Sequence, residues 1–148
     1  MHRTLFGIAF LALVVPASLA AQEANDEQAI REAVLDYVEA IYDVEPDRID
    51  RSVATDLVKR GYWRPDTSGE FREFPMTFEQ LRDLSANWNA NGHVDASTAV
   101  KEVIILDILD KTASAKLVAD WGIDYMHLAK LDGKWMIKNI LWQSPPAE

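Results

Sequence analysis

The chain has 148 residues, with 24 acidic and 15 basic side chains and a formal net charge of −9. An acidic protein repels the phosphates of nucleic acids and of anionic lipids, so neither is expected as a partner. The sequence has no cysteine, which excludes disulfides and the attachment of a lipid through an N-terminal cysteine.

Residues 1–20 have the layout of a secretory signal peptide. His2 and Arg3 precede an unbroken apolar run, and small residues follow it with the spacing of a cleavage site after Ala20. The apolar run is too short to span a bilayer, and it lacks the polar face that a helix at the surface of a domain needs. We therefore predict an exported protein, periplasmic or secreted, that is cleaved after Ala20.

Cleavage would leave residues 21–148, which we predict to form a single domain without membrane association. Loss of Arg3 leaves 14 basic residues against 24 acidic ones, a formal charge of −10. Only His93 and His127 would remain, and the sequence has neither an HExxH spacing nor a Gly-rich phosphate loop. We expect no metal and no cofactor.

The domain opens with NDEQAIREAVLDYVEAIYDVEP, in which apolar residues recur at helical spacing and acidic residues lie on the opposite face. Asn25 or Asp26 is expected to cap the start of this helix. Pro46 ends it and can open a second short helix. The residues predicted to face the core are Ile30, Ala33, Val34, Tyr37, Val38 and Ile41.

A hairpin and a third helix follow. Residues 58–64 and 70–74 have the composition of strands and flank a turn rich in Pro, Asp and Gly. Thr77 and Gln80 have the spacing of a capping box, which predicts that a helix begins there. The apolar stripe of that helix is Phe78, Leu81, Leu84 and Trp88.

The last third predicts four strands joined by tight turns. The turns are expected at Asp110-Lys111, Gly122-Ile123 and Asp132-Gly133. The last suits a type I′ turn and would set Leu131 opposite Lys134. Counting outward from the turns places one almost wholly apolar face against the helices. That face is predicted to include Glu102, Ile104, Leu106, Trp121, Asp124, Met126, Leu128, Ile137, Asn139 and Leu141.

The opposite face of the predicted sheet carries polar residues, including His127, and an apolar stripe. His127 is expected to be a surface residue. So much apolar area is unsuited to open water, so we predict a homodimer through this face. The stripe consists of Val103, Ile105, Val118, Ile140 and Trp142.

With these elements the chain resembles the nuclear transport factor 2-like superfamily, in its exported putative lumazine-binding branch near the SnoaL-like proteins. The matching pieces are DLVKRGYW, MTFEQL and DYMHLAKLDGKWMIKNILW, which with the first helix cover most of residues 25–143. The resemblance implies an α+β cone, in which a curved, mixed but mainly antiparallel sheet wraps around N-terminal helices. It also implies an apolar pocket at the mouth and dimers through the convex face. It transfers no catalytic residue.

Three polar residues point inward in the predicted register. Asp124 should have a raised pKa among apolar neighbours, which suits a general base or a hydrogen-bonding anchor for a ligand. The alternative is that Asp124 is a structural residue at the end of a strand, where its carboxylate accepts hydrogen bonds from the backbone. Asn139 is a diagonal neighbour of Asp124 and is equally a ligand contact or a structural amide. Glu102 is expected to pair with an arginine of a covering helix. A bulge at Gly122 would turn the side chains of Asp124 and Asn139 to the opposite face of the sheet.

The candidate ligand contacts combine these polar residues with aromatic and apolar ones, whose alternative role is the core. They are Tyr37, Trp63, Trp88, Glu102, Trp121, Asp124, Met126 and Asn139. The leading hypothesis is a protein that binds a small, mainly apolar or aromatic molecule. The alternatives are an isomerase, dehydratase or cyclase with Asp124 as general base, and a dimerisation module without a ligand.

Overall fold

The computed structural model describes residues 17–64 and 69–145, with side chains from residue 21 onward. The predicted signal peptide falls outside these ranges except for its last four residues. The helices are α1 (Ala17–Tyr42), α2 (Asp47–Ser52) and α3 (Phe78–Asn87). The strands are β1 (Val53–Trp63), β2 (Arg72–Met76), β3 (Lys101–Ile108), β4 (Thr112–Ala119), β5 (Gly122–Leu131) and β6 (Lys134–Gln143).

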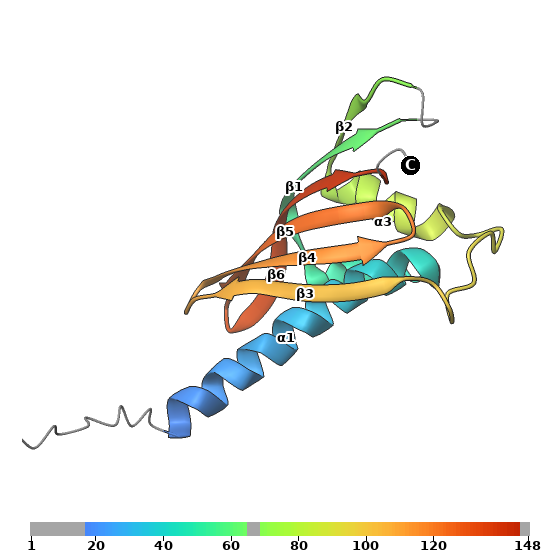
Figure 1. Ribbon diagram of the computed structural model, residues 1–148. Coiled ribbons are helices and arrows are strands. Elements are labelled where there is room, and N and C mark those ends of the chain that lie inside the picture. Colours follow the sequence, from blue (N-terminus) through green and yellow to red (C-terminus); the bar gives the residue numbers. More distant parts are fainter. Residues whose placement is uncertain (1–16, 65–68, 146–148) are drawn as a thin grey trace, which may run out of the picture.

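The strands form one curled sheet in the order β2-β1-β6-β5-β4-β3. Only β1 and β6 run parallel, and every other neighbouring pair is antiparallel. The helices lie on one face of this sheet, with α1 running along it and α3 behind the end that carries β1 and β2 (Figure 1). The predicted α+β architecture is therefore confirmed. None of the helices in residues 17–64 and 69–145 is long and apolar enough to cross a membrane.

Helix α1 supplies the central part of the core. All six residues predicted to face the core from this helix are buried. The helix is already continuous from Ala17 through Asn25 and Asp26, so the prediction that one of these two residues caps its start was wrong. Asp26 lies inside the helix, where its Oδ1 accepts hydrogen bonds from Lys130 Nζ at 2.6 Å and Trp135 Nε1 at 2.9 Å. Its carboxylate joins α1 to the sheet instead of capping the helix.

The second helix, the hairpin and the third helix predicted in the first half are confirmed, but α1 ends at Tyr42, before Pro46, and β1 begins at Val53 instead of near Val58. Helix α2 begins directly after Pro46. Gln80 N donates to Thr77 Oγ1 at 3.3 Å and Thr77 N donates to Gln80 Oε1 at 2.9 Å, which is the predicted capping box at the start of α3. Strands β1 and β2 pair as a hairpin whose turn includes residues outside the described ranges.

The hairpin of β5 and β6 follows the predicted register near its turn and departs from it further out. Leu131 lies opposite Lys134, and Asp132 and Gly133 have φ values of 48° and 83°, as a type I′ turn requires. Between the pairs Leu128–Ile137 and His127–Asn139 one extra residue is inserted in β6. Because successive residues of a strand alternate between the two faces of the sheet, the side chains after this bulge point to the face opposite to the predicted one.

The bulge in β6 reverses four predictions. Asn139 and Leu141 are exposed on the outer face, although both were predicted to point inward. Ile140 is buried, and Trp142 packs against the core. The outer apolar stripe predicted to hold the dimer together therefore loses Ile140 and Trp142.

Strand β3 contains a second bulge with the same effect. Ile105 lies opposite Ala115, whereas Asp107 lies opposite Ser114, so one residue of β3 is extra. Val103 and Ile105 consequently pack against the core, and Glu102 is exposed on the outer face. The predictions of an inward Glu102 and Leu106 and of an outward Val103 and Ile105 were wrong.

The turn between β4 and β5 also differs from the prediction. Ala119 lies opposite Gly122, which makes Asp120-Trp121 the turn instead of Gly122-Ile123. The shift in pairing is an even number of residues, so the alternation is preserved and Asp124 points inward as predicted. Gly122 has a φ of 132°, and a Cβ on it would lie 2.0 Å from the carbonyl oxygen of Gln143, so the position requires glycine.

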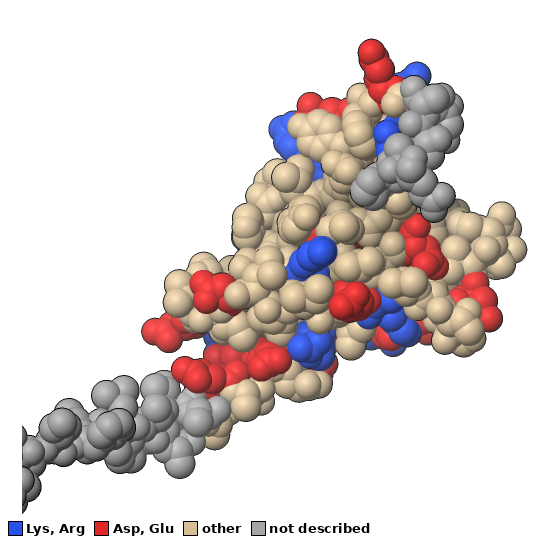
Figure 2. All heavy atoms as spheres, viewed as in Figure 1, with Lys and Arg blue, Asp and Glu red and all other residues tan. Residues whose placement is uncertain are grey.

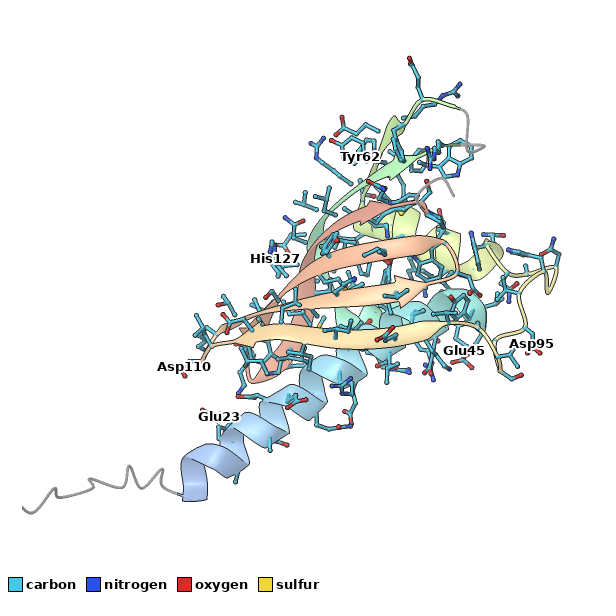
Figure 3. All side chains as sticks on the ribbon, viewed as in Figure 1. Glu23, Glu45, Tyr62, Asp95, Asp110 and His127 are labelled. Carbon is cyan, nitrogen blue, oxygen red and sulfur yellow. The ribbon has the colours of Figure 1, made fainter. Side chains whose placement is uncertain are left out.

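The outer face of the sheet is open to solvent in the described chain. Acidic and basic side chains are interspersed over the face in view, without a patch of one sign (Figure 2). His127 is exposed on this sheet, as predicted, and Asp110 marks the turn between β3 and β4 (Figure 3). The exposed apolar residues of the outer face include Leu106, Tyr125 and Leu141.

Candidate functional site

A cleft of about 550 Å³ opens at the end of the sheet that carries the β1–β2 hairpin and α3. Its walls are mainly aromatic and apolar, with one acidic and one basic side chain. Trp63, Arg64, Phe74 and Met76 come from the hairpin, and Leu84 and Trp88 from α3 and its C-cap. The remaining wall residues are Asp120, Trp121, Trp142, Ser144 and Pro145.

A smaller chamber of about 70 Å³ adjoins the cleft. The two share Met76, Leu84, Trp88, Trp121 and Trp142 as wall residues. The residues that line the chamber and not the cleft are Tyr37, Ile41 and Lys59. We refer to the cleft and the chamber together as the aromatic pocket.

The aromatic side chains of the pocket hold one another in place. Trp121 packs edge-to-face on Tyr37 and on Trp88, with ring centroids 6.2 Å and 5.5 Å apart. Tyr42 supports Trp121 from behind at 5.2 Å. The hydroxyl of Tyr42 is itself fixed, because it donates to Val100 O and accepts from Asp120 N, both at 2.8 Å. The Asp120-Trp121 turn is thereby held over the pocket.

Trp142 forms a wall of the pocket because Gly61 leaves room for it. A Cβ placed on Gly61 would lie 1.9 Å from Cε2 of the Trp142 indole. The indole therefore occupies the space above Gly61 on the neighbouring strand. The direction of Trp142 depends on the bulge in β6, and its position depends on this glycine.

Lys59, Tyr37 and Asp124 form a buried polar cluster at the inner end of the pocket. Lys59 Nζ donates to Tyr37 Oη at 2.5 Å and lies 3.7 Å from Asp124 Oδ1. The side chain of Asp124 is fully buried and that of Lys59 is 5% exposed. Trp121 Nε1 donates to the other carboxylate oxygen, Oδ2, at 2.8 Å.

The burial of this cluster shifts the acidity of each member. Burial raises the pKa of Asp124, although Lys59 and Trp121 act in the opposite direction. Burial lowers the pKa of Lys59, and the nearby charge of Asp124 opposes that shift. Burial and the same charge hold the pKa of Tyr37 well above its ordinary value. The pKa values of Asp124 and Lys59 therefore lie closer together than they do in water.

The structure brings together half of the predicted site residues. Trp88 and Trp121 line both parts of the pocket, Trp63 lines the cleft and Tyr37 lines the chamber. Asp124 lies directly behind Lys59 and is not itself a wall residue. Met126 is buried in the core and does not line the chamber. Glu102 and Asn139 are exposed on the outer face and do not reach the pocket.

Lys59 and Trp142 are the most consequential of the wall residues that the sequence analysis did not predict. Leu57, Lys59 and Gly61 alternate inward along β1, and an inward lysine on such a strand is a signal that could have identified Lys59. Trp142 gave no such signal, because its direction follows from a bulge. Within residues 17–64 and 69–145, no group of three His, Asp or Glu side chains is placed to hold a metal ion.

Comparisons with known proteins agree on the fold. The family model described as putative lumazine-binding matches residues 25–143. None of the curated proteins matches the sequence significantly.

Several solved structures resemble this one over most of their length. One is a nuclear transport factor 2-like protein from Silicibacter pomeroyi, 15% identical, with a TM-score of 0.66, covering 83% of this chain and 98% of its own. Another, from Novosphingobium aromaticivorans, has a cystatin-like fold, 10% identity, a TM-score of 0.64 and coverages of 93% and 94%. A third, a putative scytalone dehydratase from the same organism, has 13% identity, a TM-score of 0.57 and coverages of 85% and 88%. At these identities the likeness concerns the fold.

Proposed function

Because this chain belongs to the putative lumazine-binding family of nuclear transport factor 2-like proteins, we propose that it binds a small, mainly apolar or aromatic molecule in the aromatic pocket. The observation that carries the proposal is a cleft and an adjoining chamber that share aromatic walls, with a buried lysine lining the chamber. Flat aromatic walls favour flat aromatic ligands, and a few polar groups at one end orient them.

The volume of the pocket supports ligand binding over a purely structural role for the fold. Its outer cleft of about 550 Å³ lies within the range of roughly 300–1,000 Å³ that is typical of small-molecule sites. A dimerisation module without a ligand would have no use for this space, and side chains would be expected to fill it. The pocket therefore favours ligand binding over that alternative.

Native mass spectrometry of protein purified from its own cells tests the proposal. We expect a small molecule to be retained and released on denaturation. Gly61→Val is the matched variant, since the added side chain collides with the Trp142 indole and forces this wall of the pocket to move. Loss of the retained molecule in this variant, and not in an outer-face variant such as Asn139→Ala, would support the aromatic pocket as its site. Equal retention by all three proteins would refute it.

An isomerase, dehydratase or cyclase is the second candidate, favoured by the three titratable side chains at the inner end of the pocket. A group that touches the substrate would be Lys59 or Tyr37, since both line the chamber. Asp124 would act as a base only through Lys59, because its carboxylate is fully buried behind that residue. Turnover of a carbonyl substrate with exchange of its α-hydrogens for deuterium would distinguish this candidate from simple binding.

Export and dimerisation complete the proposal. The layout of residues 1–20 supports export, and the exposed Leu106, Tyr125 and Leu141 support a homodimer through the outer face of the sheet. Both are tested below.

A further inference from the structure

The inner end of the aromatic pocket is electrically neutral. Lys59 is the sole charged side chain among the described residues that line the chamber. Asp124, 3.7 Å from Lys59 Nζ and fully buried, balances it. The pair has zero net charge whether the proton resides on the amine or on the carboxyl group.

Lys59 nevertheless has hydrogen-bonding capacity to offer. An ammonium group has three N–H donors and an amine has two. Tyr37 Oη takes one of them, and Asp124 Oδ1 at 3.7 Å lies beyond ordinary hydrogen-bond length. At least one N–H of Lys59 is left for an acceptor in the chamber.

We infer that the part of the ligand that reaches Lys59 is a neutral hydrogen-bond acceptor, such as a ketone or a ring carbonyl, and that Asp124 sets this preference without touching the ligand. The inference rests on the proposed function. A carboxylate at this position would add a buried negative charge that no further cation of the chamber balances, which is costly. A neutral oxygen satisfies the free N–H and leaves the charges balanced.

The outer cleft does not alter this balance. Its charged wall residues, Arg64 and Asp120, have opposite signs and lie at the mouth. An anionic ligand could still be held at the mouth by Arg64 without entering the chamber, so the experiment includes Arg64→Gln to separate the two positions.

Three probes of nearly equal shape test the inference: 2-acetylnaphthalene with a neutral carbonyl, 2-naphthoate with a carboxylate, and 2-isopropylnaphthalene with neither. Equilibrium dialysis at pH 7 measures the dissociation constant of each. For the wild type we expect the ketone to bind at least about tenfold tighter than the other two. Arg64→Gln should leave this order unchanged.

Asp124→Asn is the decisive variant. The amide can still accept the bond from Trp121 Nε1 but no longer balances Lys59, so we expect the order to invert and 2-naphthoate to bind tightest. Lys59→Met should bind the ketone no better than the hydrocarbon. Should that variant not fold, the double variant Lys59→Met/Asp124→Asn removes both charges together and serves the same comparison.

Two results would overturn the inference while leaving the proposed function in place. They are tighter binding of 2-naphthoate by both the wild type and Arg64→Gln, and an unchanged order of affinities in Asp124→Asn. If none of the three probes binds to any of the proteins, the proposed function fails and the inference fails with it.

Discussion

Lys59 and Asp124 form a buried ion pair across an intervening strand. Lys59 lies on β1 and Asp124 on β5, and β6 separates these two strands in the sheet. The 3.7 Å contact between Nζ and Oδ1 therefore depends on β6 being in place. The pair joins the two halves of the sheet at the inner end of the pocket.

This pair should show strong thermodynamic coupling. Removing one partner leaves an uncompensated buried charge, so we expect Lys59→Met to lower the free energy of unfolding by about 3–5 kcal/mol. The double variant Lys59→Met/Asp124→Asn should regain most of that loss. Urea unfolding at pH 7 of the wild type, both single variants and the double variant measures the coupling. Additive losses would contradict it.

Asp26 should make the stability depend on pH under acid conditions. Hydrogen bonds from Lys130 and Trp135 lower the pKa of Asp26 in the folded protein. Its contribution is fully present above the pKa of the unfolded carboxyl group and is lost as pH falls through the lower folded value. We expect Asp26→Asn to cost about 1–3 kcal/mol at pH 7 and progressively less toward about pH 2.

Urea unfolding across this pH range measures the effect of Asp26→Asn. Glu23→Gln is the control, since Glu23 is exposed on the same helix (Figure 3). It should be within about 0.5 kcal/mol of the wild type at every pH. A loss for Asp26→Asn that does not change with pH would exclude an ionic role for Asp26.

Gly61→Ala should reshape the pocket. The added methyl group collides with the Trp142 indole and forces it to move, which we expect to cost about 1–3 kcal/mol of stability and to weaken binding of an aromatic probe. Asn139→Ala, on the exposed face of β6, should change neither property. Calorimetric titration with 2-acetylnaphthalene compares the three proteins. Weakened binding in Asn139→Ala would argue that the pocket is not the binding site.

The dimer prediction now concerns a different set of side chains. Leu106 is 57% exposed on the outer face, so we expect Leu106→Lys to yield a monomer while the wild type sediments as a dimer. Leu109→Lys is the control, since Leu109 is 62% exposed next to the turn between β3 and β4. A wild type that sediments as a monomer at micromolar concentration would reject the dimer.

Export should produce a mature protein that begins at Ala21. Intact-mass measurement of the protein from the periplasm and from the medium checks the cleavage site. Leu11→Arg interrupts the apolar run and should leave the uncleaved precursor in the cell. Recovery of exported protein that still carries Met1 would contradict the prediction.

The sequence predicted the features that depend on neighbouring residues. Thr77 with Gln80, and Asp132 with Gly133, are local signals, and both gave the structure that they indicate. The inward direction of Asp124 was also correct, since an even shift in pairing preserves alternation. Helix caps, tight turns and strand alternation are determined by residues that lie close together in the sequence, which is why they could be predicted.

The two bulges could not be read in the same way. An extra residue in β3 or β6 is stabilised by contacts with other strands and with the helices, which single-strand alternation does not contain. The bulge in β3 turned Glu102 to the outer face. The bulge in β6 did the same to Asn139 and brought Trp142 into the pocket. Lys59 was missed for another reason, since its buried position depends on Tyr37 of α1 and Asp124 of β5, and the sequence of β1 alone does not show these partners.

The place of β6 in the sheet has a consequence for how the chain acquires its fold. This strand comes last along the chain, yet it lies between β1 and β5 and pairs with both. Its parallel pairing with β1 closes a loop of roughly 80 residues, an arrangement that forms slowly. The sheet cannot close, and the pocket cannot form, while the nascent polypeptide still lacks its last strand. Delayed closure of this kind fits the export proposed above, because a chain whose sheet is still open stays unfolded for longer.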